Sequence, residues 1–330
     1  MRITILTYLE SEDAKEHDVV VDQVAKALRE EGHKPSVLGV HGDLGKLISG
    51  LKRRKPELVF HLLEMFGGKF RGDVEVAGLL DLMEIPYTGG GPAELSLRMD
   101  KGLAKKALAF DSILYPDFAV FARDDFETGG NLKMPLFVKP LKTDASLGID
   151  GKSLVHDAAA LMKQVASIHK TYDDAALAEE YIEGREFYVG ILGNREPKVF
   201  PPIEMDFAGL PEGAPRVLDS KAKWAEDSVE YKGTRSVLAD IPDELRARLQ
   251  KVSLDAYRAL KVRDYGRVDL RYTETGEIYV IEVNANCYLE KGSEFATAAG
   301  AAGIDYTTLV NRITELALQR HGPARTRKGA

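Results

Sequence analysis

The stretch from Arg267 to Asn284 constrains this chain more than any other. Two runs of alternating apolar and polar residues lie on either side of a short glycine-containing turn, a pattern that predicts a β-hairpin. Side chains alternate between the faces of a strand, so Arg267 and Asp269 share one face of the first strand, and Glu282 and Asn284 share one face of the second. If the register brings these faces together, Asp269, Glu282 and Asn284 converge as hard oxygen ligands suited to Mg²⁺.

A half-exposed sheet with polar residues facing water is the other interpretation of this hairpin. Glu282 and Asn284 close a run of Ile, Val and Tyr, where a core strand would not place polar residues without a partner. Arg267 adds a cation on the same face as Asp269. The pattern therefore favours a metal site.

Composition limits the class of protein. The chain has 330 residues, enough for about two or three domains. It is 44% hydrophobic and 29% charged, as in globular proteins, and its net charge of −7 argues against a general nucleic-acid binder. The apolar start is too short for a signal peptide, and no run is long enough to span a membrane. We therefore expect a cytoplasmic protein.

The single cysteine, Cys287, excludes an internal disulfide framework. It lies close to the predicted metal ligands, so a reactive thiol is one interpretation. A lone cysteine is more often a small buried apolar residue, and that interpretation is favoured here.

The first third of the chain alternates predicted strands with predicted helices. Strands are expected at 2–8, 37–40 and 58–63, and an amphipathic helix between the first two ends near Gly32. This β-α-β-α-β order predicts a parallel sheet covered by helices.

The rest of the chain predicts a mixture of strands and helices. A helix is expected to begin near Asp100, and residues 201–235 are expected to form one long loop. The other predicted elements are strands at 135–140, 176–181 and 186–192, a helix at 157–169, a helix carrying Leu245 to Leu260, the hairpin, and a last helix carrying Leu309 to Ala317.

Several short motifs occur in one order along the chain. They are Ile85–Gly91, Met99–Lys101, Phe137–Pro140, Glu179–Glu186, Arg267–Asp269 and Glu282–Asn284. Together they resemble the D-alanine–D-alanine ligase branch of the ATP-grasp superfamily. The resemblance extends from about residue 58 to the last helix.

The resemblance implies an α/β plus α+β chain with the ATP-grasp fold. An N-terminal parallel α/β domain would occupy residues 1–98, a central lobe 99–184, and a C-terminal domain 185–330. The last of these would carry the metal site and the substrate loop 201–235. Such enzymes convert a carboxylate to an acyl phosphate with ATP, and an amine then displaces the phosphate to form an amide.

The resemblance also assigns the ATP site. Lys101 and Lys139 would reach the nucleotide phosphates, since a lysine is a compact point charge suited to that task. Backbone N–H groups of a loop with Ser146 and Gly148 would cradle phosphate oxygens. The adenine and ribose would be read by Glu179, Glu180, Tyr181, Ile182 and Glu186. Solvated lysines and an acidic surface turn are the structural alternatives for these residues.

At the metal end, the resemblance makes Asp269, Glu282 and Asn284 the ligands of two Mg²⁺ ions, with Mn²⁺ able to substitute. Arg267 would stabilise the acyl phosphate and the later oxyanion, and a structural salt bridge is its alternative role.

The resemblance also assigns roles in catalysis or substrate binding to four further residues. Lys223 and Trp224 would cover the substrate, with Trp224 standing where the family has a tyrosine. Lys223 and Ser146 would also assist catalysis, and Ser293 would hold the second substrate's carboxylate.

The chain departs from the family pattern where amino acids would bind. Thr7–Glu12 lacks the family's paired glycines, and either Glu10 or Glu12 could replace its substrate-binding glutamate. The family's His-Gly and Gly-Glu-Asp-Gly elements are replaced by His61–Gly68. After the metal ligands, Cys287-Tyr288 stands where the family has Pro-Gly, and a tyrosine there would crowd a substrate.

The nucleotide and metal motifs thus follow the family pattern, whereas the motifs that would bind amino acids do not. This difference predicts an ATP-dependent carboxylate–amine ligase for a substrate pair other than two D-alanines. The expected partners are small amino-acid-like carboxylates and amines, without nucleic acid or membrane, in a chain that could form a homodimer. The alternatives are a divergent D-alanine–D-alanine ligase, an ATP-binding regulatory protein without ligase activity, and a kinase-like phosphotransferase. Retention of Arg267 argues against the regulatory protein, because ATP binding alone does not require it.

Overall fold

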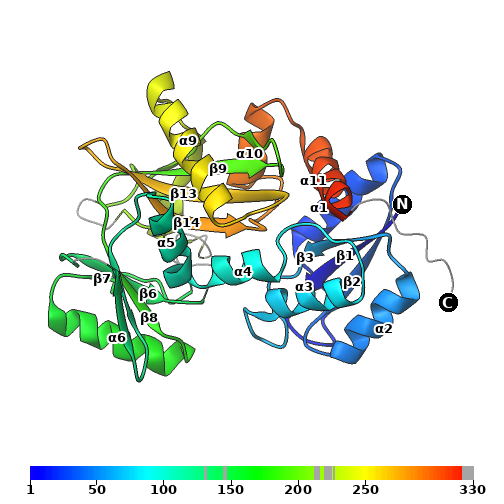
Figure 1. The fold of residues 1–330 in the computed structure, drawn as a ribbon, viewed down its shortest axis with the longest axis horizontal. Helices are drawn as coiled ribbons and strands as arrows, with labels where there is room; N and C mark the ends of the chain where they lie inside the picture. Colours follow the sequence, from blue (N-terminus) through cyan, green and yellow to red (C-terminus); the bar gives the residue numbers. More distant parts are fainter. Residues whose placement is uncertain (130–131, 144–146, 212–215, 219–224, 226, 322–330) are drawn as a thin grey trace.

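A computed structural model describes residues 1–129, 132–143, 147–211, 216–218, 225 and 227–321. Three β-sheets with helices around them make up the described fold (Figure 1). This agrees with the expected mixture of a parallel α/β part and α+β parts. We name the three parts the N-terminal, central and C-terminal lobes after their sheets.

The N-terminal lobe is built on a parallel three-stranded sheet in the order β2-β1-β3. The amphipathic helix α1 buries Val20, Val24 and Leu28 against it, and Asp18 caps the helix by accepting a hydrogen bond from the Val20 N–H. The elements of this lobe are β1 (Arg2–Tyr8), α1 (Val19–Glu30), β2 (Lys34–Val40), α2 (Leu44–Arg54), β3 (Leu58–Leu62) and α3 (Gly72–Leu82).

Two short helices, α4 (Pro92–Met99) and α5 (Lys101–Phe110), lead from the N-terminal lobe to the others. Helix α4 has proline in its first turn, where the missing N–H needs no partner. Asp100 caps α5 by accepting a hydrogen bond from the Leu103 N–H at 3.1 Å. The helix predicted near Asp100 therefore begins there.

The central lobe holds an antiparallel sheet in the order β5-β4-β8-β6-β7. Helix α6 packs on one face, where Val165 and Ile168 join Val138 and Ala178 in a small core. The elements are β4 (Phe118–Phe121), β5 (Phe126–Gly129), β6 (Leu136–Pro140), β7 (Leu154–Val155), α6 (Ala158–Tyr172) and β8 (Ala176–Glu180).

The C-terminal lobe holds the largest sheet, with strands in the order β12-β11-β9-β13-β14 and β10 paired to β9. Alternate residues of β9 face opposite ways: Phe187 packs with helix α9, and Tyr188 packs with helix α10. The elements are β9 (Arg185–Leu192), β10 (Lys198–Val199), β11 (Ile203–Asp206), α8 (Val229–Gly233), β12 (Arg235–Leu238), α9 (Asp243–Ala259), β13 (Tyr265–Tyr272), β14 (Ile278–Ala285) and α10 (Glu294–Ala301).

The expectation of one long loop over residues 201–235 is wrong. Strand β11 lies inside this range and pairs with β9 and β12, and helix α8 follows it. The run Ile203–Asp206 alternates apolar and polar residues, but it is only four residues long and follows two prolines. A strand this short gives little periodic signal.

The last helix, α11 (Tyr306–His321), leaves the C-terminal lobe and packs beside α1 (Figure 1). Leu309 and Ile313 share a core with Leu28 and Ile5. The last helix, expected in a C-terminal domain of residues 185–330, therefore covers the N-terminal sheet. The domain boundaries themselves stay predictions.

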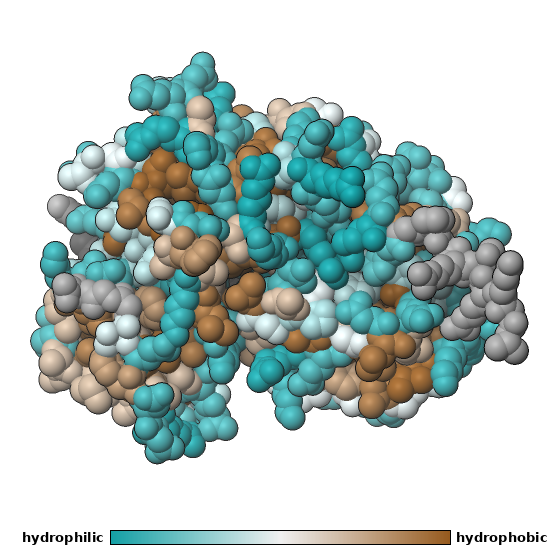
Figure 2. Space-filling model, viewed as in Figure 1, coloured by the Kyte–Doolittle hydropathy of each residue, from teal (hydrophilic) through white to brown (hydrophobic). Residues whose placement is uncertain are grey.

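The face seen in Figure 2 is mostly hydrophilic, with apolar residues gathered over the central lobe and a notch beside the N-terminal lobe. None of the helices in the described ranges is long and apolar enough to cross a lipid bilayer.

Candidate active site

The hairpin of β13 and β14 brings its polar residues directly opposite one another. Asp269 pairs with Glu282, and Arg267 pairs with Asn284, across the antiparallel ladder. The Asn284 amide donates a hydrogen bond to Asp269 Oδ2 at 3.1 Å. The register that the metal-site interpretation required is therefore present, and the three oxygen-bearing side chains lie on one face.

Arg267 is held tightly in this cluster. Its Nε lies 2.7 Å from Asp269 Oδ1 and its Nη2 lies 2.9 Å from Oδ2, while Nη1 reaches Glu294 Oε2 at 3.3 Å. The guanidinium also stacks over the Tyr188 ring at 4.7 Å. The salt bridge considered as an alternative role for Arg267 is thus present, and it fixes the guanidinium beside the predicted metal ligands.

The electrostatics of the cluster favour an added cation. Burial raises the pKa of Asp269 to about 6, and although Arg267 opposes this shift, the nearby Glu282 and Glu186 reinforce it. Asp269, Glu282 and the Asn284 amide thus bring together hard oxygens of the kind that suits a divalent metal ion.

Buried lysines lie next to the carboxylates. Both Lys139 and Lys105 place Nζ 2.8 Å from opposite oxygens of Glu179. Although burial alone would raise it, these two lysines lower the pKa of Glu179 to about 2. Lys101 donates to the Thr143 carbonyl at 3.0 Å and lies 3.6 Å from Glu282 Oε1. The structure therefore brings the two predicted phosphate-binding lysines to the metal-site carboxylates.

Sequence reasoning missed Lys105. It follows Lys101 by four residues, so both lysines lie on the same face of α5. That spacing was the available signal. The result is a buried Lys105–Glu179–Lys139 triad, with Glu179 only 3% exposed.

The predicted adenine-reading strand lines a cavity of 120 Å³. Both oxygens of Glu179 face lysines, so its carboxylate is already engaged. Glu180 accepts the Lys133 N–H at 2.9 Å, and the Tyr181 N–H is bonded to the Pro135 carbonyl at 3.0 Å. The expected roles of Glu179, Glu180, Tyr181 and Ile182 toward adenine stay predictions.

Glu186, the expected ribose acceptor, lines the same cavity. It forms an ion pair with Arg271 and accepts a hydrogen bond from the Tyr188 hydroxyl at 2.5 Å. Its two partners fix the carboxylate at the edge of the cavity.

A larger cavity of 610 Å³ joins six of the predicted site residues, whereas Asp269 lines the 120 Å³ cavity. Lys101, Lys139, Arg267, Glu282, Asn284 and Ser293 all line the larger cavity. Ser293 also caps α10, where its hydroxyl accepts the Ala296 N–H at 3.4 Å. Its role toward a substrate carboxylate stays a prediction.

Part of the predicted site lies outside the described residues, namely Ser146, Lys223 and Trp224. Gly148, the other predicted phosphate-loop residue, has φ +80°, and a Cβ there would lie 2.6 Å from Pro140 Cγ. Only glycine fits that position.

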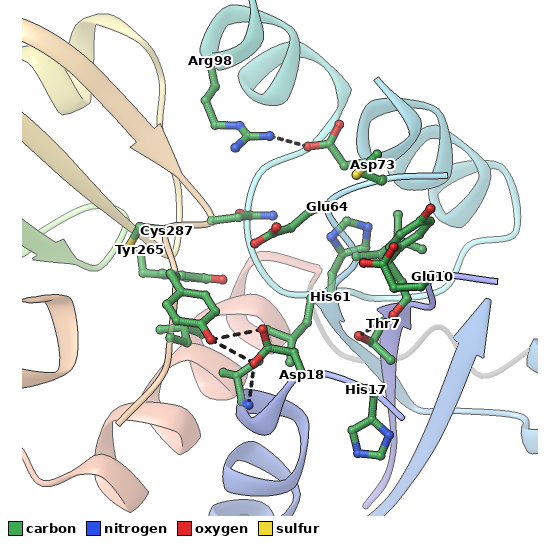
Figure 3. Close-up of a pocket in the computed structure, with 18 of the residues that line it drawn as sticks. Thr7, Glu10, His17, Asp18, His61, Glu64, Asp73, Arg98, Tyr265 and Cys287 are labelled. Atoms are coloured by element: carbon green, nitrogen blue, oxygen red, sulfur yellow. Dashed lines mark hydrogen bonds and ion pairs between the residues drawn. The ribbon is translucent and has the colours of Figure 1, made fainter. Parts of the chain in front are cut away.

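A separate cavity of 390 Å³ opens at the carboxyl ends of β1 and β3 (Figure 3). Glu10 lines this cavity, whereas Glu12 accepts hydrogen bonds from the Gly42 and Asp43 N–H groups and from Lys46. Of the two glutamates considered from the sequence, only Glu10 therefore faces the cavity.

Residues from the replaced motifs also line this cavity. The Tyr288 hydroxyl donates to Asp18 at 2.9 Å, so this tyrosine links the C-terminal lobe to the start of α1. Cys287 is buried, as expected, and burial raises its pKa to about 12, which keeps the thiol protonated.

Comparisons with known proteins agree with this geometry. A family model described as "D-ala D-ala ligase C-terminus" matches residues 111–315. The D-alanine–D-alanine ligase of Aquifex aeolicus is 32% identical over 293 residues, which cover 88% of this chain and 91% of that ligase. A protein of Sinorhizobium fredii, named uncharacterized protein y4sG, is 34% identical over 310 residues, covering 92% and 88%.

Among solved structures, the D-alanine–D-alanine ligase of Bacillus anthracis complexed with ATP superposes with a TM-score of 0.75 at 25% identity. The match covers 97% of this chain and 98% of that one. Fold and site together define an ATP-grasp enzyme. More closely, the chain belongs to the D-alanine–D-alanine ligase family and is an ATP-dependent carboxylate–amine ligase that forms ADP.

Proposed function

We propose that this ligase transfers the γ-phosphoryl group of ATP to a substrate carboxylate and then joins the acyl group to an amine. In the first step a carboxylate oxygen bonds to phosphorus and the bond to ADP breaks. In the second step the amine nitrogen bonds to the acyl carbon, loses a proton, and inorganic phosphate leaves. The single observation that carries this proposal is the cavity in which Lys101, Lys139 and Arg267 face Glu282 and Asn284.

The charged side chains are placed for phosphoryl transfer, which depends mainly on positioning and charge neutralisation. Lys101 and Lys139 would hold phosphate oxygens, and the loop with Ser146 and Gly148 would cover them. Asp269, Glu282 and Asn284 would hold two Mg²⁺ ions, with Mn²⁺ able to substitute. Such ions would supply positive charge that neutralises the charge developing on phosphoryl transfer.

Arg267 would stabilise the acyl phosphate and the oxyanion formed when the amine attacks. Its guanidinium is partly buried and fixed by Asp269, Glu294 and the Tyr188 ring. A donor fixed before reaction needs no reorganisation when charge develops. Lys223 and Trp224, in the predicted substrate loop 201–235, would cover the substrate. Ser293 would hold the amine substrate's carboxylate.

The substrate pair would differ from two D-alanines. The support is the exchange of the family's Pro-Gly for Cys287-Tyr288, because the Tyr288 ring reaches across to Asp18. It occupies space that a glycine would leave open. A divergent D-alanine–D-alanine ligase is the second candidate, favoured by 32% identity to ligases of that name. A homodimer and a cytoplasmic location stay predictions.

The test is phosphate release from ATP and Mg²⁺ by the purified protein. D- and L-amino acids, hydroxy acids and dipeptides are supplied singly and in pairs, with products identified by mass spectrometry. Release that depends on an added amine, with an amide product, supports the ligase. Release with a single substrate and no amide would point to a kinase-like reaction. Robust formation of D-alanyl-D-alanine would reject the altered substrate pair.

A further inference from the structure

The 390 Å³ cavity shares lining residues with the 610 Å³ cavity and none with the 120 Å³ cavity. It lies where β1 and β3 end, the edge of a parallel sheet at which ligands commonly bind. Asp18, Arg98, Asn286 and Tyr288 line both this cavity and the 610 Å³ cavity that holds Arg267. A molecule bound here can therefore present one end to the phosphoryl-transfer site.

Carboxylates dominate the charge around this cavity. Glu10, Glu16, Asp18 and Glu64 all line it, and they come from two different segments of the N-terminal lobe. Arg98 also lines it, but its guanidinium lies 2.7 Å from the buried carboxylate of Asp73, which balances its charge. A cleft lined by one sign of charge concentrates ligands of the other sign.

A buried histidine among these carboxylates points to a ligand. His61 is 1% exposed and lines the cavity, yet neither ring nitrogen has a hydrogen-bond partner among the described residues. In the view of Figure 3, its ring lies between the side chains of Glu64 and Glu10. A neutral imidazole offers one donor and one acceptor, and leaving both unmade in the interior is costly.

His61 does not offset the acidic charge. Burial, together with the smaller effect of the nearby Arg98, lowers the pKa of His61 to about 4. The ring is thus neutral at neutral pH. The surroundings keep their excess of negative charge, and the unprotonated nitrogen remains free to accept a hydrogen bond from an ammonium group.

We propose that this cavity binds the carboxylate substrate and that this substrate is a basic amino acid, carrying an ammonium or guanidinium group on its side chain. A zwitterionic amino acid with a neutral side chain brings no net charge, so it leaves the acidic excess as it was. A basic side chain brings the missing positive charge. The cavity also holds on the order of ten water molecules at about 30 Å³ each, more room than a methyl side chain would fill.

The inference rests on the proposed ligase function, but its test does not require turnover. Calorimetric titrations compare lysine with norleucine, which has the same chain without the terminal ammonium. Both enantiomers are titrated into the whole protein in the presence of Mg²⁺ and a non-hydrolysable ATP analogue. We expect lysine to bind at least about ten-fold more tightly than norleucine, with the difference shrinking as salt is raised. Equal affinities for the two would overturn the proposal.

Matched variants locate the effect. Glu10→Gln and Glu16→Gln each remove one charge from the cavity and should weaken lysine binding by about three- to ten-fold, as for partly solvated ion pairs, while leaving norleucine binding unchanged. Asp13→Asn removes the same charge from the same segment, but Asp13 is exposed and does not line the cavity. Equal weakening in all three variants would overturn the site.

Phosphate release separates this inference from the proposed function. If only neutral amino acids trigger phosphate release and lysine does not bind, the proposed basic substrate is wrong, whereas the proposed ligase function is supported. If lysine binds preferentially but no amino acid pair triggers release, the cavity is right and the ligase reaction is wrong.

Discussion

The nucleotide end and the amino-acid end of this site handle charge in opposite ways. At the nucleotide end, buried Glu179 is paired with two buried lysines, and buried Asp269 is paired with the partly buried Arg267. At the amino-acid end, Glu10 and Glu16 are exposed. Buried charges must be paired, so they hold one geometry, whereas exposed carboxylates can be exchanged at little cost in stability. Under the proposed function, the chemistry would therefore depend on buried ion pairs, and the choice of substrate on exposed carboxylates at the edge of the 390 Å³ cavity.

The largest effect should follow from changing the two carboxylates proposed as metal ligands. Asp269→Asn and Glu282→Gln should each lower ATP-dependent phosphate release about a thousand-fold, since several kcal/mol of charge stabilisation would be lost. Release is measured at saturating ATP, with the melting temperature as a control for folding. Unchanged rates in both variants would show that Asp269 and Glu282 do not bind a required metal ion. The contrast between the two ends of the site would then fail as well.

Loss of the buried triad should weaken the fold. Glu179→Gln leaves Lys105 and Lys139 buried without a counter-ion, so the free energy of unfolding should fall by about 3–5 kcal/mol. Urea denaturation measures it. Glu127→Gln, which breaks the exposed pair with Lys106 in the same lobe, should cost under about 1 kcal/mol. Similar losses in both would mean that burial of the triad adds nothing.

Divalent-cation binding should report the raised pKa of Asp269, about 6. Protons and cations compete for this carboxylate. Affinity should therefore be constant above about pH 6 and fall by up to about ten-fold per pH unit below it, as the carboxyl becomes protonated. Mn²⁺ titrations from pH 5 to pH 8 measure this. A transition near pH 4, the range of an ordinary aspartate, would contradict the effect of burial.

The smallest effect on stability is expected at the exposed edge of the 390 Å³ cavity, where Tyr288 lies. Tyr288→Phe removes the hydroxyl that donates to Asp18, and the unfolding free energy should fall by about 1 kcal/mol or less. Tyr172 is equally exposed at 39%, and its hydroxyl makes no hydrogen bond with the described residues. Tyr172→Phe should therefore change nothing in the same urea titration. A loss above about 2 kcal/mol for Tyr288→Phe would show that this residue is structural.

The faces of the two hairpin strands could be predicted because side chains alternate along a strand, but the pairing of Asp269 with Glu282 depends on the extra residue Ile281, which no sequence pattern indicated. The contacts of Glu10 and Glu12 could not be predicted, because the side chains of an irregular segment do not repeat with a fixed period. Only the tertiary structure places Glu12 at the start of α2 and Glu10 in the cavity. Loop chemistry is thus the part of the site least accessible from sequence.

The last helix illustrates the same limit for the fold. Its apolar stripe, with Leu309 and Ile313, predicts that one face is buried. The stripe does not say which lobe covers it, because any apolar surface would serve. The structure places it against α1 and the N-terminal sheet.

One irregularity of β14 determines which side chains line the 120 Å³ cavity. The pairing passes from Asp269–Glu282 directly to Leu270–Val280, so Ile281 is an extra residue in the strand. In a regular strand, neighbours point to opposite sides. Here Ile281 and Glu282 both line the 120 Å³ cavity. A single extra residue thus brings two adjacent side chains to one cavity, where, under the proposed function, Ile281 would offer an apolar wall to a flat ring and Glu282 would bind a cation.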